Sequence, residues 1–242
     1  MIFNRQNKES DLNPDFFKEF IQFTKLAASA EKRFELNWEN KYPCLNDKSA
    51  TTGFDPHYVY HTAWAARLVK DINPSEHIDI SSYLYFATIL SAFIPVRFFD
   101  FRPAKIKLSK LEMQSADLYD LSFESNSISS LSCMHVVEHI GLGRYGDPLD
   151  YDGDLKAIKE LKRVLKPNGN LLFVVPIGKP KIMFNAHRIY GYDQILQYFG
   201  DLQLVEFSLI PDNGFEVGIQ KNATKEMADI QEYGCGCFWF KK

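Results

Sequence analysis

From residue 76 onward, short apolar runs alternate with amphipathic stretches, and this alternation limits the possible folds more than any other feature of the chain. The apolar runs have the length of strands and lie at 77–80, 96–101, 111–116, 129–134, 171–175, 202–209 and 237–240. Helical patterns lie between them, at 84–93, 155–165 and 192–199. Strands that alternate with helices form βαβ units, so we expect an α/β fold with a mostly parallel sheet and helices on both faces.

The first 75 residues have a different, helical pattern. Asn13-Pro14 is a helix start signal, and a stripe of Phe and Ala residues continues the helix to about Asn37. A loop at 42–56 and a second helix at 57–70 follow. We therefore expect a helical N-terminal extension over 1–75, within the same globule as a Rossmann-like domain over 76–242. The first helix could act as a lid, as a homodimer surface or as core packing.

Composition excludes several classes of protein. Among 242 residues, 45% are hydrophobic and 14% aromatic, which is too much apolar surface for a disordered chain. A net charge of −3 argues against a nucleic-acid partner, which needs clustered basic residues. The N-terminus has no apolar signal segment, and the longest uncharged run, 80–96, is shorter than the roughly 20 residues of a membrane span. We expect a cytoplasmic protein with no membrane span, whose four irregularly spaced cysteines are free thiols.

Polar residues follow five of the predicted strands. Ligands of open α/β sheets bind beyond the carboxyl ends of the strands, where the strand order reverses. The segments at these ends are 79–82, 100–102, 117–118, 135–139 and 176–178. Asp79, Asp100 and Asp117 give three of them an acidic group, which suits the hydroxyl and amino groups of a nucleoside.

Two longer segments resemble the class I S-adenosylmethionine-dependent methyltransferases. They are ADLYDLSFESNSISSLSCMHVVEH at 116–139 and LKRVLKPNGNLLFVVP at 161–176. The resemblance implies a Rossmann-like, mostly parallel sheet whose last strand is antiparallel. The strings HVVEHIGLGRYGDP at 135–148 and FNAHR at 184–188, with HYVYH at 57–61, look like a methyltransferase-related family of unknown function, found in bacterial surface-glycan gene clusters and in nematodes.

The superfamily resemblance implies S-adenosylmethionine as cofactor and a role for each strand-end residue. Asp100 would bind the ribose hydroxyls, Asp117 the adenine amino group, and Leu118 would add an apolar wall. The remaining cofactor-binding candidates are Asp79, Ser81, Ser82 and His135. Alternatively, Asp100 and Asp117 only cap strand ends, and Asp79 only binds nearby backbone amides.

The loop after the first strand departs from the superfamily. Methyltransferases carry a glycine-rich loop there, which lets the backbone approach the cofactor. Residues 79–86 contain no glycine, and Tyr85 and Phe86 stand where a small residue is expected. Either the cofactor is held in an altered pose, or the pocket no longer accepts it.

Several residues could carry methyl transfer to a hydroxyl, which benefits from a general base. His139 and His187 are the candidate bases, and Glu138 or Asp147 could orient or replace them; each His could instead be a hydrogen-bonded core or loop residue. Candidate acceptor-binding residues are Arg144, Tyr145, Asn185 and Arg188. Arg144 could instead form an ion pair with Asp147. Glu138, His139 and Asp147 match no metal-ligand spacing, so we predict no metal site.

These observations favour methyl transfer to a hydroxyl of a sugar or other small metabolite, in surface-polysaccharide synthesis. That acceptor class follows only from the family resemblance. The alternative is a non-catalytic binding or scaffolding protein whose cofactor loop has degenerated. A third hypothesis is another nucleotide- or sugar-modifying reaction in the same cleft.

Overall fold

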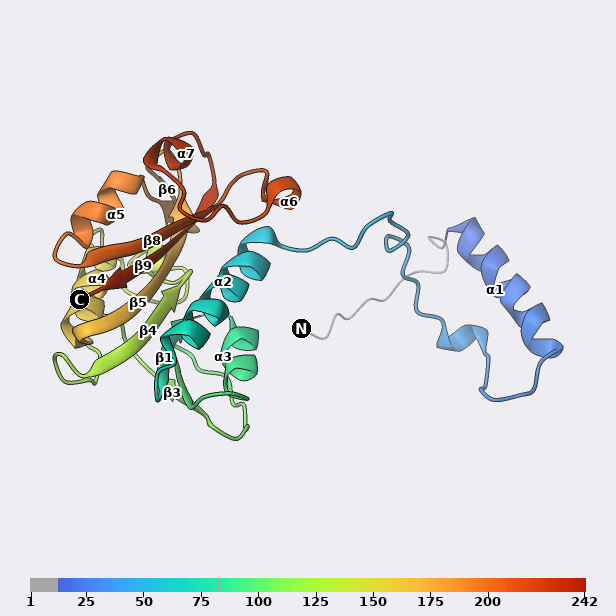
Figure 1. Ribbon diagram of the computed structural model, residues 1–242. Coiled ribbons are helices and arrows are strands. Elements are labelled where there is room, and N and C mark those ends of the chain that lie inside the picture. Colours follow the sequence, from blue (N-terminus) through green and yellow to red (C-terminus); the bar gives the residue numbers. More distant parts are fainter. Residues whose placement is uncertain (1–12, 82) are drawn as a thin grey trace. The chain divides into compact units, whose positions relative to one another are not determined.

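The computed structural model describes residues 13–81 and 83–242, which fall into two compact units, 1–53 and 54–242 (Figure 1). In the first unit, helix α1 (Pro14–Ala28) begins as predicted, because the Asn13 side chain accepts a hydrogen bond from the amide of Asp15. The predicted helix was too long. It ends at Ala28 because Ser29 caps it, its amide and hydroxyl both bonding the carbonyl of Leu26. Three Phe rings of α1 contact Trp38 in the short 3-10 helix η2 (Trp38–Asn40).

The second unit is built on a seven-stranded sheet with the order β3-β2-β1-β4-β5-β9-β8. Its strands are β1 (His77–Ser81), β2 (Val96–Asp100), β3 (Leu111–Ser115), β4 (Ile128–Met134), β5 (Leu165–Ile177), β8 (Gln203–Ile210) and β9 (Gly234–Lys241). The β1–β2, β2–β3, β1–β4 and β4–β5 pairs are parallel, whereas β9 runs antiparallel to both of its neighbours. The expected fold is therefore confirmed, including the antiparallel last strand.

Helices cover both faces of the sheet (Figure 1). One apolar core lies between the sheet and helices α2 (Pro56–Ile72) and α3 (Leu84–Leu90). The core on the other face involves α4 (Gly153–Val164), α5 (Tyr192–Tyr198) and α7 (Lys225–Asp229). Shorter elements complete the unit: η3 (Val137–His139), α6 (Gly214–Val217) and the hairpin of β6 (Lys181–Met183) and β7 (His187–Ile189).

Helix α2 belongs to the same compact unit as the sheet, and this unit runs from Phe54 to Lys242. Its buried face includes Trp64, whose indole N–H donates to a Glu206 carboxylate oxygen at 2.7 Å. Among the helices that the structure describes, none is both long enough and apolar enough to cross a membrane.

Strand β5 is irregular at its start. Strand β5 already begins at Leu165, which pairs with Ile128, and regular pairing resumes only at Asn170 opposite Ser130. The intervening residues bulge out of the ladder, and Asn168 takes a left-handed backbone with φ of 62°.

A buried polar group links β1 to β4. The His77 ring nitrogens lie 2.8 Å from the Ser130 hydroxyl and 2.9 Å from that of Ser132, which in turn donates to Asp79 at 2.5 Å. Asp79 is fully buried, and burial raises its pKa to about 7 even though the Ser132 hydrogen bond opposes the shift.

This raised pKa predicts a pH-dependent gain in stability for Asp79→Asn. The unfolded chain ionises Asp79 near pH 4, so its contribution to stability is complete below that pH and is lost as the pH rises through about 7. The stability of Asp79→Asn relative to the parent should therefore increase by about 2–4 kcal/mol between pH 4 and 7.5. Urea unfolding over this range measures the difference, with the exposed Asp71→Asn as control. A difference that does not change with pH would contradict the assignment.

Candidate functional site

Two adjoining cavities lie at the carboxyl edge of the sheet, beyond β1, β2 and β4. One measures about 330 Å³ and the other about 1120 Å³. His135, His139 and Tyr145 line both of them. Cavities of this size at the strand-order reversal between β1 and β4 are typical of small-molecule sites in such sheets. Molecules bound in the two cavities would therefore border the same three side chains.

The smaller cavity contains most of the predicted cofactor residues. Asp100, Asp117, Leu118 and Ser81 line it together with His135. One oxygen of Asp100 accepts from the amide of Arg102 at 2.6 Å, and one oxygen of Asp117 accepts from the amide of Tyr119 at 2.9 Å. Each carboxylate thus caps its loop with one oxygen, as the alternative interpretation expected, and still contributes to the cavity wall.

One further cofactor candidate, Asp79, is not part of this wall. Asp79 is enclosed in the sheet beside Ser132, and it is absent from the described lining of the smaller cavity. This position agrees with a structural role for Asp79. Ser82 lies outside the described residues, so the prediction for it stays a prediction.

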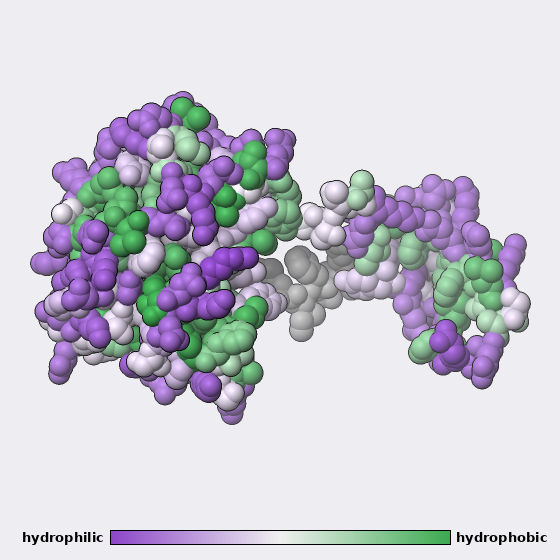
Figure 2. All heavy atoms as spheres, viewed as in Figure 1, coloured by the Kyte–Doolittle hydropathy of each residue, from purple (hydrophilic) through white to green (hydrophobic). Residues whose placement is uncertain are grey.

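The aromatic residues of the glycine-free loop point away from the smaller cavity. Tyr83, Tyr85 and Phe86 line a separate groove between α2 and α3, and no ring of these three borders the smaller cavity as described. Tyr85 is 68% exposed, and Figure 2 shows apolar side chains at the surface over these helices. A Tyr85 or Phe86 ring in this cavity would favour the interpretation that the pocket no longer accepts the cofactor, and its described lining contains neither ring.

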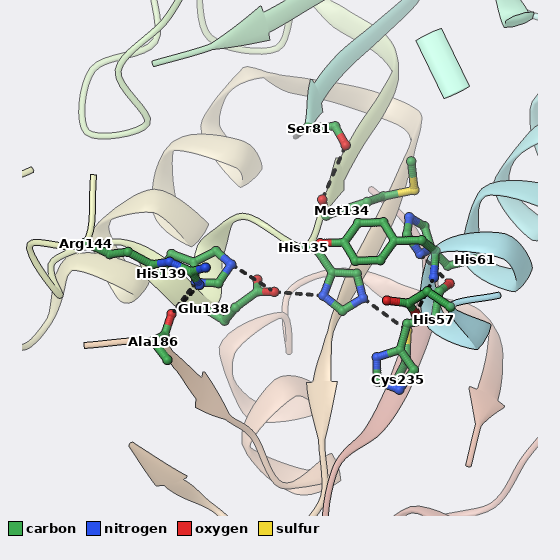
Figure 3. Close-up of polar contacts among 12 residues, drawn as sticks. His57, His61, Ser81, Met134, His135, Glu138, His139, Arg144, Ala186 and Cys235 are labelled. Carbon is green, nitrogen blue, oxygen red and sulfur yellow. Dashed lines mark hydrogen bonds and ion pairs between the residues drawn. The ribbon is translucent and has the colours of Figure 1, made fainter. Parts of the chain in front are cut away.

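A buried carboxylate organises the larger cavity. Glu138, in η3, is 1% exposed, and its Oε1 lies 2.8 Å from Nδ1 of His135 and 3.8 Å from Nε2 of His139 (Figure 3). Burial alone favours the protonated acid, but the hydrogen bond and charge of His135, together with His139, leave the pKa of Glu138 below its usual value. Its second oxygen, Oε2, is buried without a hydrogen-bond partner among the described residues.

His139 is held in one orientation by the loop that precedes β7. Its Nδ1 lies 2.6 Å from the carbonyl of Ala186, which also accepts from Arg144 at 3.1 Å (Figure 3). A neutral imidazole that donates from Nδ1 keeps its lone pair on Nε2, the nitrogen on the side of Glu138. His187 lines the same cavity, and partial burial lowers its pKa, so its imidazole is neutral near pH 7.

Asp147 stabilises a loop, which gives no support to its predicted catalytic role. Its carboxylate accepts hydrogen bonds from the amides of Gly141, Gly143 and Tyr145, at 2.8, 3.3 and 3.1 Å. Gly141 has φ of +80°, and a Cβ there would lie 2.1 Å from the carbonyl oxygen of Asp150. Arg144 donates to Ala186 rather than pairing with Asp147 as the alternative supposed.

Arg188 and Asn185 do not reach the described wall of the larger cavity. Arg188 is 5% exposed and donates to the carbonyls of Ile140 and Tyr151, at 2.6 and 3.0 Å. It also lies 3.6 Å from the carboxylate of Asp154. Asn185 is exposed in the preceding turn. Arg188 therefore secures the loop that carries the site, and the geometry does not support binding of the acceptor by either residue.

Three further residues lie at this site and are not among the candidates from the sequence: His57, Tyr233 and Cys235. His57 lies in the first turn of α2, and its ring stacks on that of His135 and on that of Tyr233, with ring centroids 5.8 and 5.2 Å apart. Burial, followed by the charge of His135, lowers the pKa of His57 to about 4. Cys235 Sγ lies 3.4 Å from Nε2 of His135. These residues come from distant segments, so no local spacing could have grouped them.

The chain is similar to known proteins in part of its sequence and in its fold. The family model described as "Caenorhabditis protein of unknown function, DUF268" matches residues 102–233, more than half of the chain. No curated protein sequence matches the chain. The fold is similar to that of the N-methyltransferase NodS from Bradyrhizobium japonicum, solved with S-adenosylhomocysteine (TM-score 0.54, 14% identity, 82% of this chain and 93% of that one). It is also similar to a putative sarcosine dimethylglycine methyltransferase from Galdieria sulphuraria (TM-score 0.52, 14% identity, 76% and 86%).

The two arginines of the site should differ in their effect on stability. Arg188→Ala removes a buried charge from its carbonyl partners and leaves the buried Asp154 carboxylate without its cationic partner, so we expect a loss of about 3–5 kcal/mol in the free energy of unfolding. Arg144→Ala changes an exposed side chain and should cost less than about 1 kcal/mol. Chemical denaturation measures both variants, and equal losses would show that Arg188 does not secure the loop.

Proposed function

We propose that this chain, which belongs to the DUF268 family of proteins of unknown function, transfers a methyl group from S-adenosylmethionine to a hydroxyl of a sugar or other small polar metabolite. The observation that carries the proposal is the pair of cavities that meet at His135, His139 and Tyr145. Direct transfer between two bound molecules needs two sites with a shared boundary, because most of the rate comes from holding the reactants in line.

The residues of the smaller cavity suit the cofactor. Asp100 ends β2 and would bind the ribose hydroxyls, while Asp117 would accept from the adenine amino group beside the apolar side chain of Leu118. Ser81 would lie at the methionine end. When bound, S-adenosylmethionine supplies an electrophilic methyl group. The similar fold of NodS, which was solved with S-adenosylhomocysteine, supports this choice of ligand.

Glu138 is the group that would bind the acceptor hydroxyl. An anionic carboxylate oxygen that is buried without a partner is costly, and an O–H donor from a ligand would satisfy it. Glu138 lines the larger cavity and accepts from His135 through its other oxygen. The same carboxylate can therefore fix His135 and orient a hydroxyl at the boundary of the two cavities.

His139 is the general base in this proposal. Its Nδ1 bonds the carbonyl of Ala186, so Nε2 is the nitrogen that accepts a proton. After the transfer, the imidazolium has Glu138 Oε1 at 3.8 Å as a counterion. His187 is the second candidate, since its ring lies 6.3 Å from that of His139. It lines the larger cavity, in which the acceptor would bind (the acceptor cavity), and is not part of the described wall of the smaller one.

The wall of the larger cavity suits a polyhydroxylated acceptor. It combines aromatic rings, including Tyr58, Tyr145 and Tyr233, with the carboxylate of Asp212 and the guanidinium of Arg144. Aromatic faces can stack on the apolar faces of sugar rings, and carboxylates accept from hydroxyls. A role in surface-polysaccharide synthesis follows from the family resemblance described above.

The competing function is a non-catalytic binding protein, which the glycine-free loop at 79–86 favours. That function requires the smaller cavity to reject the cofactor. Binding of the cofactor product therefore separates the two functions.

We expect the folded protein to bind S-adenosylhomocysteine, measured by calorimetry. Asp100→Ala should weaken this binding by about 10- to 100-fold, because hydrogen bonds to a charged group contribute about 1.5–3 kcal/mol. Asp71→Ala, an exposed acid on α2, is the matched control and should bind like the parent. Folded protein that binds no S-adenosylhomocysteine at millimolar concentration would contradict methyl transfer and favour the non-catalytic alternative.

We expect His139→Ala to lower turnover by about 10²- to 10⁴-fold, as for loss of a general base, and to change S-adenosylhomocysteine affinity much less. Transfer of a labelled methyl group from S-adenosylmethionine to a panel of sugars and nucleotide sugars provides the activity. His187→Ala serves as the comparison. Loss of turnover in His187→Ala alone would assign the base to His187, and unchanged turnover in both variants would exclude both as the base.

A further inference from the structure

We propose that His57, His135 and Cys235 form a binding site for a divalent transition metal of the zinc type at the wall of the acceptor cavity. The donor atoms of these three side chains all lie within 4.8 Å of one another. Figure 3 shows the side chains of His57 and His135 near that of Cys235, with a dashed line from the His135 ring to the Cys235 thiol. Two imidazoles and one thiolate are a ligand set that zinc prefers over magnesium or calcium.

The spacing of the donor atoms fits a tetrahedral ion. Zn–N bonds of about 2.0 Å and Zn–S bonds of about 2.3 Å place neighbouring ligand atoms roughly 3.3–3.6 Å apart. His135 Nε2 and Cys235 Sγ are already separated by 3.4 Å. His57 lies in the first turn of α2, its ring is half-buried, and its donor atom lies within 4.8 Å of the other two.

Glu138 gives His135 the arrangement of a metal ligand. Histidine ligands usually donate their second ring N–H to a carboxylate or carbonyl, which fixes the ring and increases its basicity. His135 Nδ1 lies 2.8 Å from Glu138 Oε1, so the other nitrogen, Nε2, faces Cys235. The left-handed backbone of His135, with φ of 53°, turns the chain at the end of β4 where this ring is placed.

The surroundings of the cluster also indicate a ligand. His61 is fully buried, its ring lies 5.1 Å from that of His135, and its Nε2 has no partner among the described residues. A buried imidazole nitrogen without a partner is costly in a protein interior. A third imidazole therefore lies beside the cluster, with one nitrogen that no described protein group satisfies.

The position of the cluster suggests what the metal does. His57 and His135 line the acceptor cavity, and three protein ligands leave the fourth position of a tetrahedral ion open, as in catalytic zinc sites. On binding, Cys235 loses its thiol proton to solvent and bonds the ion as a thiolate. An acceptor hydroxyl in the open position would become more acidic and pass its proton to His139; this use of the ion rests on the proposed methyl transfer, whereas the site itself does not.

Cobalt(II) titration of the purified chain tests the site directly. We expect one equivalent to bind and to produce a near-ultraviolet thiolate-to-cobalt absorption band together with the visible bands of a tetrahedral ion. Cys235→Ser should abolish the near-ultraviolet band, and His57→Gln should weaken cobalt binding at least tenfold. Cys133→Ser, which removes another buried thiol, and Cys44→Ser, which removes the exposed one, should leave the spectrum unchanged.

Circular dichroism confirms that each variant is folded, and His57→Gln changes a half-buried residue, so the test does not depend on Cys235→Ser alone. A cobalt spectrum without a thiolate band, or one that survives in both Cys235→Ser and His57→Gln, would overturn the proposal and leave a thiol–imidazole hydrogen bond only. Binding of S-adenosylhomocysteine, measured separately, distinguishes failure of the metal site from failure of the methyltransferase proposal.

Discussion

The hydrogen bond between Glu138 and His135 is the interaction on which the rest of the site depends. It joins a buried anion to an imidazole that borders both cavities, and burial makes either group costly without the other. Because it fixes Nδ1 of His135 as a donor, it determines that Nε2 faces Cys235. Because it occupies only one oxygen of Glu138, it leaves the other available to a ligand.

Around this pair, the charged residues that hold the loop in place differ from the residues whose rings line the cavities. Arg188 and Asp147 are both engaged with backbone groups of the loop between β4 and α4, one with carbonyls and the other with amides. Charged residues that satisfy a loop in this way keep it ordered without an apolar core of its own. The rings of His135, His139 and Tyr145, in contrast, line the two cavities.

The alternation of strands and helices was sufficient to predict the sheet, its parallel part and the cavity edge. It could not distinguish a residue that lines the cavity from one that supports it. Asp100 and Asp79 both end a strand in the sequence, but only Asp100 borders the cavity, because Asp79 points to Ser132 inside the sheet. Likewise, Tyr85 and Phe86 occupy the expected glycine positions, and only the direction of α3 shows that their rings face α2. The cluster of His57, His135 and Cys235 depends on tertiary packing, which no spacing pattern contains.

The placement of β9 also has a consequence for the order of assembly. In the sheet, β8 is hydrogen-bonded only to β9, which lies between it and β5 although it follows β8 in the chain. Strand β8 therefore cannot pair with the sheet before β9 is in place. Pairing between segments that are distant in the sequence is slow. Tyr233, which lines the larger cavity, directly precedes β9, so the wall of this cavity is complete only once β9 has taken its place between β5 and β8.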